Sequence, residues 1–413
     1  MKKTYLFCLF VTVTVTSPLP LLQTASQGED MVVVVPGDLD GDKIVSESEL
    51  ADNILLYLTA TYLGESNEHL KLDKLREAAH IHRYYPRTII DSAGRNVTIY
   101  KPLKRIVVFN SETVETMRSL NTTDKIVGVG KYTIKDKIFF PEFANYPNVG
   151  SVWSPNYEEV LNCNPDAVFL YATCSPSYCE AIQNKLNELD SDIIVVRLDC
   201  FKPASYTKEV EDLGYILEKE EEAKTLVDFY EGVLNSIKEK VDAIPDEDRP
   251  EVYFEAYDRY KTAGRESGWH QKLIAAGANN IFSDLSGGYV YVDAEEVVKR
   301  NPEFIVSAPS YYAGGYDTDD ITELSKPWKE IVSRPELAKV NAVKNGNVYV
   351  LSSDAFGGVR HFVAIAYMAK WFHPGLFEDL DPKAIHQEYL IRFQGLDYDL
   401  GKHGVFVYPP LGS

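Results

Sequence analysis

Three features of the 413-residue sequence predict an α/β protein with two lobes, one long helix that joins them, and a small helical module at the N-terminus. The first is the segment 220–244, in which apolar residues recur at every third or fourth position without a break. The second is a pair of similar segments, one on each side of that helix. The third is the acidic loop 38–49, which two helical patterns follow.

The segment 220–244 has the features of a single amphipathic helix. Glutamates crowd its first turn and Lys238 and Lys240 lie near its end, which suits the helix dipole. Pro245 ends it. At 1.5 Å per residue the helix would span about 37 Å, the width of a small domain. An ordinary surface helix is the alternative interpretation.

The similar segments 157–169 and 294–306 favour the bridging interpretation. Each has a pair of acidic residues in a short helix, an Asn-Pro pair that stops the helix, and then a buried strand. Their separation is too large for a solenoid repeat and fits two related lobes. We therefore expect the long helix to join one lobe to the other.

Composition and the N-terminus restrict the class of protein. With 45% hydrophobic and 25% charged residues, the chain is expected to form two or three globular domains with an ample core. A net charge of −20 argues against a nucleic-acid partner. Residues 1–26 resemble a secretory signal with cleavage near Ser26, and no other run approaches the ~20 apolar residues of a membrane span. We expect an exported, extracytoplasmic protein associated with the cell surface.

Four cysteines remain after the signal, at positions 163, 174, 179 and 200. In an exported protein two disulfides are the plain interpretation, and Cys174–Cys179 is the easiest local pair. A metal site is the alternative. The sequence leaves the connectivity open.

The loop 38–49 matches the calcium loop of an EF-hand. Five side chains and one backbone carbonyl occupy positions 1, 3, 5, 7, 9 and 12 of that pattern. Lys43 stands at position 6, where glycine is usual, and dockerin-type loops, which this segment resembles, relax that glycine. Helices are expected at 48–62 and 68–81, within a module of residues 30–85. We expect a structural calcium ion, with an acidic helix-capping turn as the alternative. The predicted ligands are Asp38, Asp40, Asp42, Ile44, Ser46 and Glu49.

The remaining elements follow from local patterns. A hairpin is expected at 88–100 and strands at 105–109, 192–198 and 249–257, with a hairpin arm at 344–351. Helices are expected at 113–120, which residues 110–112 cap, and at 206–217 and 361–372. The expected domains are an N-terminal lobe at 88–204, linking helices at 205–245 and a C-terminal lobe at 246–413.

The segments 91–120, 126–130 and 148–171 carry a resemblance to a known family. In this order they look like the N-terminal lobe of the ABC-importer substrate-binding proteins that carry iron siderophores, haem or vitamin B12, the helical-linker class. The tail 385–409 is similar to archaeal and thermophile members connected with iron uptake. The resemblance, which runs from about Thr88 onward, implies two Rossmann-like lobes joined by a rigid helix, and a binding protein rather than an enzyme. Nothing in the sequence resembles a catalytic triad, a phosphate loop or a zinc signature.

Candidate ligand contacts lie in the loops that follow strands, because ligands of open α/β lobes bind outside the carboxyl ends of the strands. Aromatic walls would bury a flat chelate, and arginines offer paired donors to an anionic group. Each aromatic residue can instead cap a core, each arginine can pair with an acid, and the histidine can be structural rather than a metal ligand. The candidates are Asn110, Ser111, Lys131, Tyr132, Trp153, Tyr171, Tyr257, Arg265, Trp269, Tyr289, Tyr311, Tyr312, Phe356, Arg360 and His361.

Two hypotheses of function follow. The first is a receptor that captures a metal chelate and delivers it to membrane permease subunits. The expected ligand is a ferric siderophore of negative charge, because Lys131, Lys261, Arg265 and Arg360 lie in candidate loops. Iron would enter only as part of this ligand, and cobalamin, haem or a nickel chelate are the alternatives. The second hypothesis is a calcium-dependent surface scaffold or adhesion protein whose lobes bind no small molecule.

Glu158 and Glu295 occupy equivalent positions in the two similar segments, each in the first turn of its helix. In the resembling family, acidic residues at these positions dock onto arginines of the two permease subunits. The alternative is that both only complement helix dipoles. We expect the protein to be a monomer.

Overall fold

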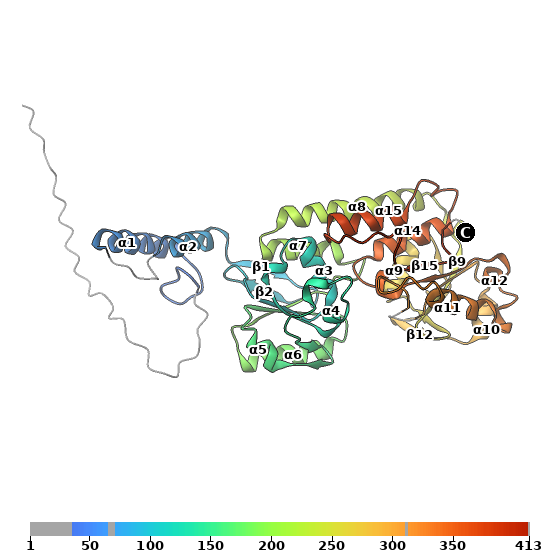
Figure 1. The fold of residues 1–413 in the computed structure, drawn as a ribbon, viewed down its shortest axis with the longest axis horizontal. Coiled ribbons are helices and arrows are strands. Elements are labelled where there is room, and N and C mark those ends of the chain that lie inside the picture. Colours follow the sequence, from blue (N-terminus) through green and yellow to red (C-terminus); the bar gives the residue numbers. More distant parts are fainter. Residues whose placement is uncertain (1–34, 65–70, 310–312, 412–413) are drawn as a thin grey trace, which may run out of the picture. The chain divides into compact units, whose positions relative to one another are not determined.

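The computed structural model describes residues 35–64, 71–309 and 313–411, and Figure 1 shows how their elements are arranged. The predicted signal segment 1–26 lies outside these residues. The N-terminal module contains α1 (Glu47–Leu63) and α2 (Leu72–Tyr84), close to the predicted helices. Ser46 caps α1, since its side chain accepts a hydrogen bond from the Glu49 amide and the Glu49 side chain accepts one from the Ser46 amide. None of the described helices combines the length and the apolar character that crossing a membrane requires.

The N-terminal lobe is built on a parallel sheet. A hairpin of β1 (Arg87–Ile90) and β2 (Asn96–Ile99) precedes it. The four strands lie in the order β4 (Ile126–Val129), β3 (Ile106–Val108), β7 (Ala167–Leu170) and β8 (Ile194–Arg197). Every residue of β3 and β7 is buried, which is typical of a parallel sheet covered on both faces. The lobe also contains α3 (Ser111–Ser119), α4 (Lys131–Lys135), β5 (Gly150–Ser151), β6 (Ser154–Pro155), α5 (Tyr157–Asn162), α6 (Pro176–Leu189) and α7 (Tyr206–Leu217).

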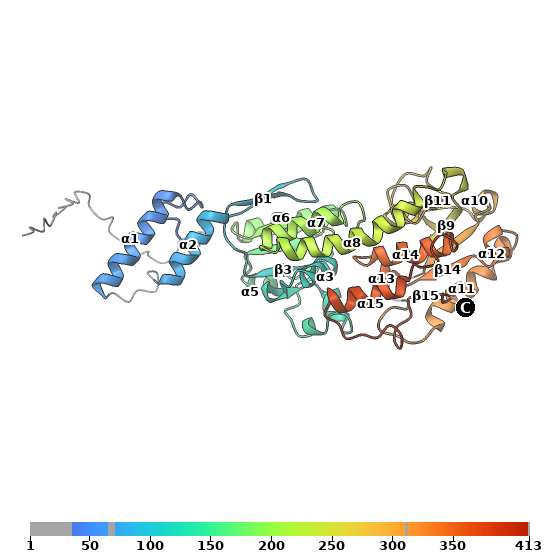
Figure 2. The same ribbon diagram turned by 90° about the horizontal axis from the view of Figure 1, so that it is seen from above.

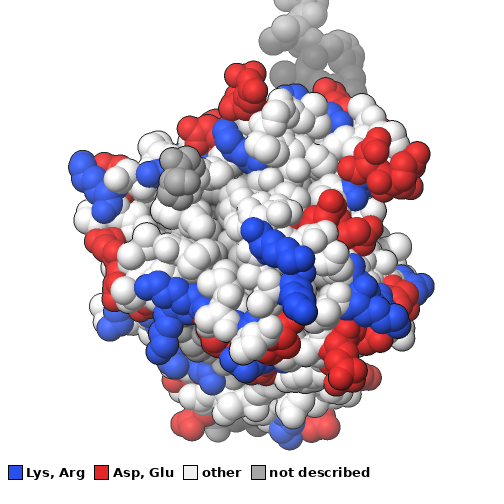
Figure 3. Space-filling view, turned by 90° about the vertical axis from the view of Figure 1, so that its right-hand side faces the viewer, with Lys and Arg blue, Asp and Glu red and all other residues white. Residues whose placement is uncertain are grey.

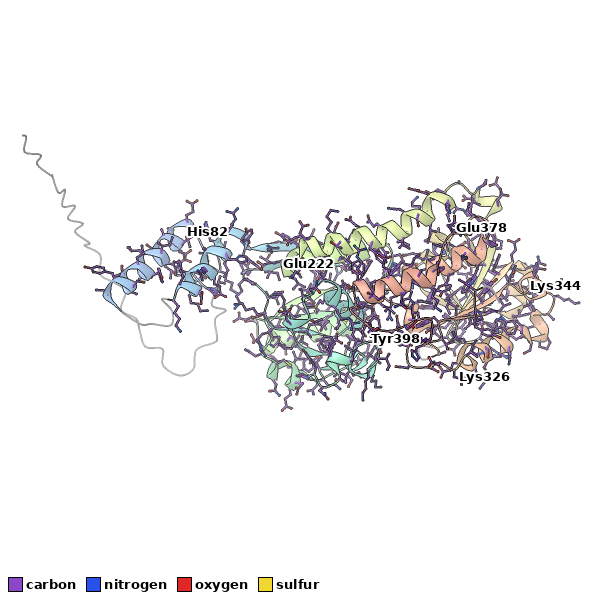
Figure 4. The ribbon with its side chains drawn as sticks, turned by 45° about the horizontal axis from the view of Figure 1, so that its top comes forward. His82, Glu222, Lys326, Lys344, Glu378 and Tyr398 are labelled. Carbon is purple, nitrogen blue, oxygen red and sulfur yellow. The ribbon has the colours of Figure 1, made fainter. Side chains whose placement is uncertain are left out.

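The long helix α8 (Glu220–Val241) joins the lobes, which confirms the central prediction from the sequence. Figures 1 and 2 show it running from the N-terminal lobe to the C-terminal lobe, and Figure 4 places Glu222 near its first end. Its buried residues are those of the predicted apolar stripe, among them Leu226, Tyr230 and Ile237. Phe229 packs on the rings of Phe362 and Phe393, so that α8 also contacts the C-terminal helices.

The C-terminal lobe has a mixed sheet in the order β12, β10, β9, β13, β14 and β15, with β11 beside β9. β9, β13, β14 and β11 run parallel, whereas β10, β12 and β15 pair antiparallel with their neighbours. The strands are β9 (Glu251–Ala256), β10 (Lys261–Ala263), β11 (Asn279–Asn280), β12 (Tyr289–Tyr291), β13 (Phe304–Ala308), β14 (Val348–Leu351) and β15 (Val407–Tyr408). The helices are α9 (Gly268–Ala275), α10 (Ala294–Arg300), α11 (Thr322–Val332), α12 (Asn341–Asn345), α13 (Ser353–Phe356), α14 (His361–Phe372) and α15 (Pro382–Arg392).

One predicted element of this lobe is wrong. The segment 344–351 is not a hairpin arm, because Gly346 ends α12 in a left-handed conformation (φ 76°) and β14 then enters the sheet between β13 and β15. Its antiparallel partner β15 comes from the far C-terminus, a pairing that local patterns do not reveal.

Figure 3 views this lobe from its outer end and shows acidic and basic side chains interspersed over that face.

The expected disulfides are also wrong, since all four cysteines of the N-terminal lobe are free thiols. Cys163 and Cys179 belong to one hydrophobic cluster, and the Cys200 thiol accepts a hydrogen bond from Thr113. Burial raises the pKa of Cys179 to about 11, which keeps this thiol protonated. The three buried cysteines, Cys163, Cys179 and Cys200, act as small apolar core residues.

Candidate functional site

The structure places most of the predicted candidate loops where parallel strands end. Asn110 and Ser111 follow β3, Lys131 and Tyr132 follow β4, and Tyr171 follows β7. In the C-terminal lobe Tyr257 follows β9, and β13 leads toward Tyr311 and Tyr312, which lie outside the described residues. Because carboxyl ends of parallel strands share one edge of a sheet, these loops of a lobe lie at the same edge of its sheet.

On the N-terminal lobe, a lysine and two aromatic rings form one surface. Lys131 Nζ lies 4.9 Å from the centre of the Tyr132 ring, and the rings of Tyr132 and Trp153 meet edge to face at 6.2 Å. Trp153 is 47% exposed, and its Nε1 donates a hydrogen bond to Ser175 Oγ at 3.0 Å. The surface therefore offers a flat apolar area next to a positive charge.

Glu112, which the sequence analysis did not single out, lies at the centre of this lobe's edge. Tyr171 Oη donates a hydrogen bond to Glu112 Oε2 at 2.7 Å. Burial, together with the nearby charges of Glu115 and Asp199, raises the pKa of Glu112 to about 7 despite the Tyr171 bond. A side-chain carbon built on Gly358 of the C-terminal lobe would come within 3.2 Å of Glu112 Cγ. Glu112 therefore lies where the two lobes meet.

A second lysine of this lobe, Lys202, also lies over an aromatic ring. Its Nζ is 5.7 Å from the centre of the Phe201 ring, which in turn meets Tyr171 edge to face at 6.1 Å. Lys202 Nζ is 3.8 Å from Asp199 Oδ2. Phe201 and Lys202 come after β8, so the rule that ligands bind at the carboxyl ends of strands could have nominated them too.

On the C-terminal lobe three tyrosines surround one lysine. Lys261 Nζ lies 5.3 Å from the ring centre of Tyr257, 5.4 Å from that of Tyr289 and 5.9 Å from that of Tyr291. Tyr289 is 40% exposed and Tyr291 is 68% exposed. Tyr257 has a left-handed backbone (φ 66°), which turns the chain between β9 and β10. The arrangement again joins aromatic surface to positive charge.

The two predicted arginines contact protein groups. Arg360 is 6% exposed, and its Nε lies 3.2 Å from Glu115 Oε1 of the N-terminal lobe. Its guanidinium also lies 4.1 Å from the centre of the Phe139 ring. Arg265 donates to the carbonyl oxygens of Ser283 (2.9 Å) and Asp284 (3.2 Å). Arg360 thus joins the lobes, in keeping with the alternative that it pairs with an acid.

Several other candidates lie in the interior. Trp269 stacks on Phe254 at 4.5 Å, and Phe356 is fully buried. His361 Nε2 is 2.7 Å from Tyr230 Oη and its Nδ1 is 2.9 Å from the Gly358 carbonyl. Burial and the nearby Lys272 charge lower the pKa of His361 to about 3. This histidine has both nitrogens engaged, which favours the structural alternative.

Asn110 is also buried. Its Nδ2 donates to Thr113 Oγ1 at 2.6 Å and to the Leu198 carbonyl at 3.1 Å. The side chain thereby ties the start of α3 to the end of β8. Ser111, the next residue, is half-buried at the same edge.

The acidic loop of the module brings three carboxylates together. Oxygen atoms of Asp38, Asp40 and Asp42 lie within 4.8 Å of one another. Lys43 has φ 71°, the left-handed conformation that glycine supplies at this position of calcium loops. Hydrogen bonds from the amides of Ser46 and Leu39 lower the pKa of Glu49 to about 2. Carboxylates with a neighbouring backbone carbonyl are a donor set that suits calcium.

The paired acids of the two similar segments show the same pattern of exposure. Glu158 on α5 and Glu295 on α10 are exposed, whereas Glu159 and Glu296 are half-buried. Neither Glu158 nor Glu295 has an ion-pair partner in the part of the chain that the structure describes. Figure 1 shows α5 and α10 on the sides of their lobes that face away from α8.

Comparison with known proteins shows what kind of protein this is. Residues 106–355 match the family described as periplasmic binding protein. The chain is 25% identical over 270 residues to the petrobactin-binding protein YclQ of Bacillus subtilis, covering 64% of this chain and 78% of that one. It is 25% identical over 233 residues to a cobalamin-binding protein of Halobacterium salinarum, covering 55% and 59%.

A solved structure shows the same fold. The TroA-like periplasmic binding protein FepB of Veillonella parvula superposes with a TM-score of 0.65 at 25% identity, over 78% of this chain and 99% of that one. Members of this family are non-enzymatic transport components that bind small ligands outside the cytoplasm for ABC importers. Because the family match covers more than half of the sequence, the chain belongs to the periplasmic binding protein family.

Proposed function

We propose that this protein captures an anionic metal chelate, most of all a ferric siderophore, between its lobes and delivers it to the permease of an ABC importer. The observation that carries the proposal is the repeated pairing of lysine with aromatic rings at the strand ends of both lobes. A ring in contact with a cation presents apolar area and charge in a fixed arrangement. This suits a flat ligand of negative charge, and it is notable in a chain of net charge −20.

The sequence analysis assigned the positive charge to Arg265 and Arg360 as well as to Lys131 and Lys261. Arg360 is buried against Glu115 and Arg265 donates to two carbonyls, so we assign the charge contacts to Lys131, to Lys261 and to the half-buried Lys202, whose Nζ also lies 3.8 Å from Asp199 Oδ2. The residues that we propose as further contacts are Ser111, Tyr132, Trp153, Tyr171, Tyr257 and Tyr289. Their burial removes Asn110, Trp269, Phe356 and His361 from this set.

Relatives support two classes of ligand. YclQ is named for petrobactin, and the Halobacterium relative is named for cobalamin. A cobalamin would rely on aromatic contacts and depend little on lysine charge. The charge of the three lysines is therefore the property that separates the two ligands.

Binding titrations of the purified mature chain test the proposal. We expect a ferric catecholate siderophore to quench the fluorescence of the exposed Trp153, and we expect Lys131→Gln with Lys261→Gln to weaken binding by roughly 1.5–3 kcal/mol for each charge-assisted hydrogen bond that is lost. Lys326→Gln, which changes an exposed lysine on α11 that is not among the proposed contacts, is the matched control (Figure 4). Tight binding of cobalamin that the lysine substitutions leave unchanged would overturn the choice of a ferric siderophore as the ligand.

We also propose that Asp38, Asp40, Asp42, Ile44, Ser46 and Glu49 hold one calcium ion with a structural role. The clustered carboxylates and the left-handed Lys43 support it. A ligand that binds only the folded state at 100 times its Kd stabilises that state by about 2.7 kcal/mol. Calcium should therefore raise the melting temperature of the module, while chelate binding by the lobes persists in EGTA. Asp40→Asn with Asp42→Asn should abolish the rise in melting temperature that calcium causes. If calorimetry shows no heat of calcium binding, the loop is only an acidic turn.

We propose that the chain is exported and held at the cell surface, and that the lobes dock on the permease through Glu158 and Glu295. The exposed, unpaired state of both acids supports this docking role. The archaeal character suggested by the tail 385–409 and the dockerin-like nature of the module stay parts of the proposal. A monomer remains our expectation.

A further inference from the structure

Helix α1 of the N-terminal module exposes most of its large apolar side chains. Leu55 is 63% exposed and Tyr62 is 89% exposed. The exposed large apolar residues of α1 are Ile54, Leu55, Leu56, Leu58, Tyr62 and Leu63. A helix that is apolar around much of its circumference is normally buried. The residues that the structure describes leave this face of α1 in contact with solvent.

The other side of α1 is fixed to the rest of the module. The helix packs against α2 (Figure 2). Asn53 Nδ2 donates hydrogen bonds to the carbonyl oxygens of Gly37 and Glu49, each at 2.8 Å. Glu49 and Ala60 are the buried residues of the helix. The exposed apolar face therefore belongs to a helix that the module already holds in place.

This face is broader than the stripe by which one helix usually meets a protein. Ile54 and Leu56 are two positions apart, so they point about 200° apart around the helix axis. Leu55, Leu58 and Tyr62 point into the sector between them. A helix in a protein groove uses residues at i, i+3, i+4 and i+7, a stripe roughly 100° wide. A face about twice as wide suits a medium that closes around the helix, as lipid does.

The apolar part of α1 carries no charge. Residues 53–63 contain no ionisable acid or base apart from tyrosine, although charged residues make up 25% of the chain. The acids of α1 are Glu47, Glu49 and Asp52, all before this run, and the helix has no lysine or arginine. Attraction between opposite charges therefore cannot supply the binding energy of this face. Removal of its apolar surface from water can.

The length of the uncharged run fits a helix that lies in the surface of a bilayer. Residues 53–63 extend over about 16 Å at 1.5 Å per residue, well short of the ~30 Å hydrocarbon core. An apolar run of this length belongs to a core helix or to a helix at a membrane interface, and the exposure of α1 excludes the first. Tyr57 and Tyr62 suit the second, since tyrosine is enriched where lipid meets water.

A second copy of this chain fits the face less well than lipid does. Each copy carries a net charge of −20, which opposes self-association. The seam between two packed helices is also a narrow stripe, so that much of the exposed face of α1 would stay in water.

We infer that α1 is a lipid-binding helix, which inserts its apolar face of residues 54–63 into the interface of a neutral membrane and holds the receptor there. The inference rests on the proposal that the chain is exported and held at the cell surface, and it names the element that would hold it. Because binding by an interfacial helix scales with its buried apolar area, one short helix should attach reversibly.

Flotation of the purified mature chain with phosphatidylcholine vesicles tests the inference. We expect the chain to float with the vesicles and to stay bound at ~1 M salt, where charges are screened beyond about 3 Å. Leu55→Gln with Leu58→Gln should lower the partition coefficient about tenfold or more for each leucine that no longer enters the lipid. Leu189→Gln with Ile391→Gln, which changes exposed apolar residues of α6 and α15, should leave it unchanged.

A conservative variant separates apolar burial from a change in the shape of the helix. Leu55→Met with Leu58→Met keeps the face apolar and should bind vesicles as the parent chain does. No flotation, binding that requires acidic lipid or is lost at high salt, or equal losses in the two glutamine pairs would overturn the inference. A dimer in sedimentation that Leu55→Gln with Leu58→Gln dissociates would also overturn it, because a second copy would then cover α1.

Two parallel measurements separate this inference from the proposed function. Chelate titrations of both leucine variants should match those of the parent chain, so a failure at the membrane is distinct from a failure of the chelate site. In fractionated cells, Leu55→Gln with Leu58→Gln should move the chain from the surface to the medium. Surface retention of this variant would reject α1 as the element that holds the chain, while the surface location itself would stand.

Discussion

The two lobes grow from similar sequence segments, yet they bring opposite chemistry to the surface where they meet. The N-terminal lobe supplies the acids Glu112 and Glu115 from one helix, α3. The C-terminal lobe supplies Arg360 and the hydroxyl of Tyr389, which donates to Glu115 Oε1 at 2.9 Å. The two similar segments therefore give the lobes similar frameworks, but each lobe contributes different residue types to the contact between them.

A network of hydrogen bonds along α3 also joins the two lobes through different residue types on each side. Arg118 Nε donates to Gln394 Oε1 at 2.7 Å, and Gln394 Nε2 donates to Ser119 Oγ at 2.6 Å. All three residues are buried. Buried polar groups that are hydrogen-bonded on both sides specify one arrangement of their elements, because alternative arrangements would leave them unpaired.

The largest expected effect comes from breaking the ion pair between the lobes. Arg360→Ala leaves Glu115 buried without its charged partner, and removal of one member of a buried pair costs about 3–5 kcal/mol. We expect a loss of that size in the free energy of unfolding from urea denaturation. Arg360→Ala with Glu115→Gln should recover part of it, because the unpaired charge is gone. A loss below about 1 kcal/mol in the single variant, the range of surface pairs, would show that the pair does not fix the lobes.

A smaller effect is expected from Glu112, the acid that lies opposite Gly358. Its pKa in the folded protein, about 7, is raised above the ordinary value of 4.5. The folded state therefore holds the proton more tightly than the unfolded state, and the stability that this contributes is lost as the pH rises from about 4.5 to 7. Binding of an anionic chelate should weaken over the upper part of the same range, because ionised Glu112 repels it.

The variant Glu112→Gln, whose side chain stays neutral, measures how much the ionisation of Glu112 changes the affinity for the chelate. We expect its chelate affinity to vary less between pH 6 and 8 than that of the parent chain, since the side chain can no longer ionise. Glu159→Gln on α5 is a control, because this acid lies away from the contact between the lobes. An unchanged pH profile in Glu112→Gln would remove Glu112 from the ligand surface.

The smallest effect on stability is expected where the two lobes are alike. Glu158→Ala with Glu295→Ala removes two exposed acids, each of which contributes at most ~0.3–1 kcal/mol through the helix dipole. Chelate affinity should not change, while uptake by cells that carry the importer should fall sharply, because such charges set encounter and register with a partner.

The half-buried neighbours make a matched control for that experiment. Glu159→Ala with Glu296→Ala should reduce uptake much less than the exposed pair, although Glu296 also loses its 3.3 Å ion pair with Lys299. Normal uptake in the exposed double variant, or lost chelate binding in the purified protein, would show that these acids do not dock the receptor.

Local sequence patterns were enough to predict the framework of this protein. The spacing of apolar residues in 220–244 predicts α8, and the duplicated helix and strand predict α5 with β7 and α10 with β13. These features are readable because helix and strand periodicity is a local property of the chain. The rule that ligands bind at the carboxyl ends of strands nominated loops that the structure places after β3, β4, β7 and β9.

The contacts of each candidate side chain became known from the three-dimensional structure alone. Arg360 comes after β14 and Lys261 begins β10, but Arg360 meets a buried acid from the other lobe and Lys261 meets three rings near the surface. Cys163 and Cys179 share one core cluster as thiols, although the four cysteines and the predicted export signal suggested disulfides. The physical reason is that burial, pairing and pKa depend on residues far apart in the chain, and local sequence patterns carry no information about those distances.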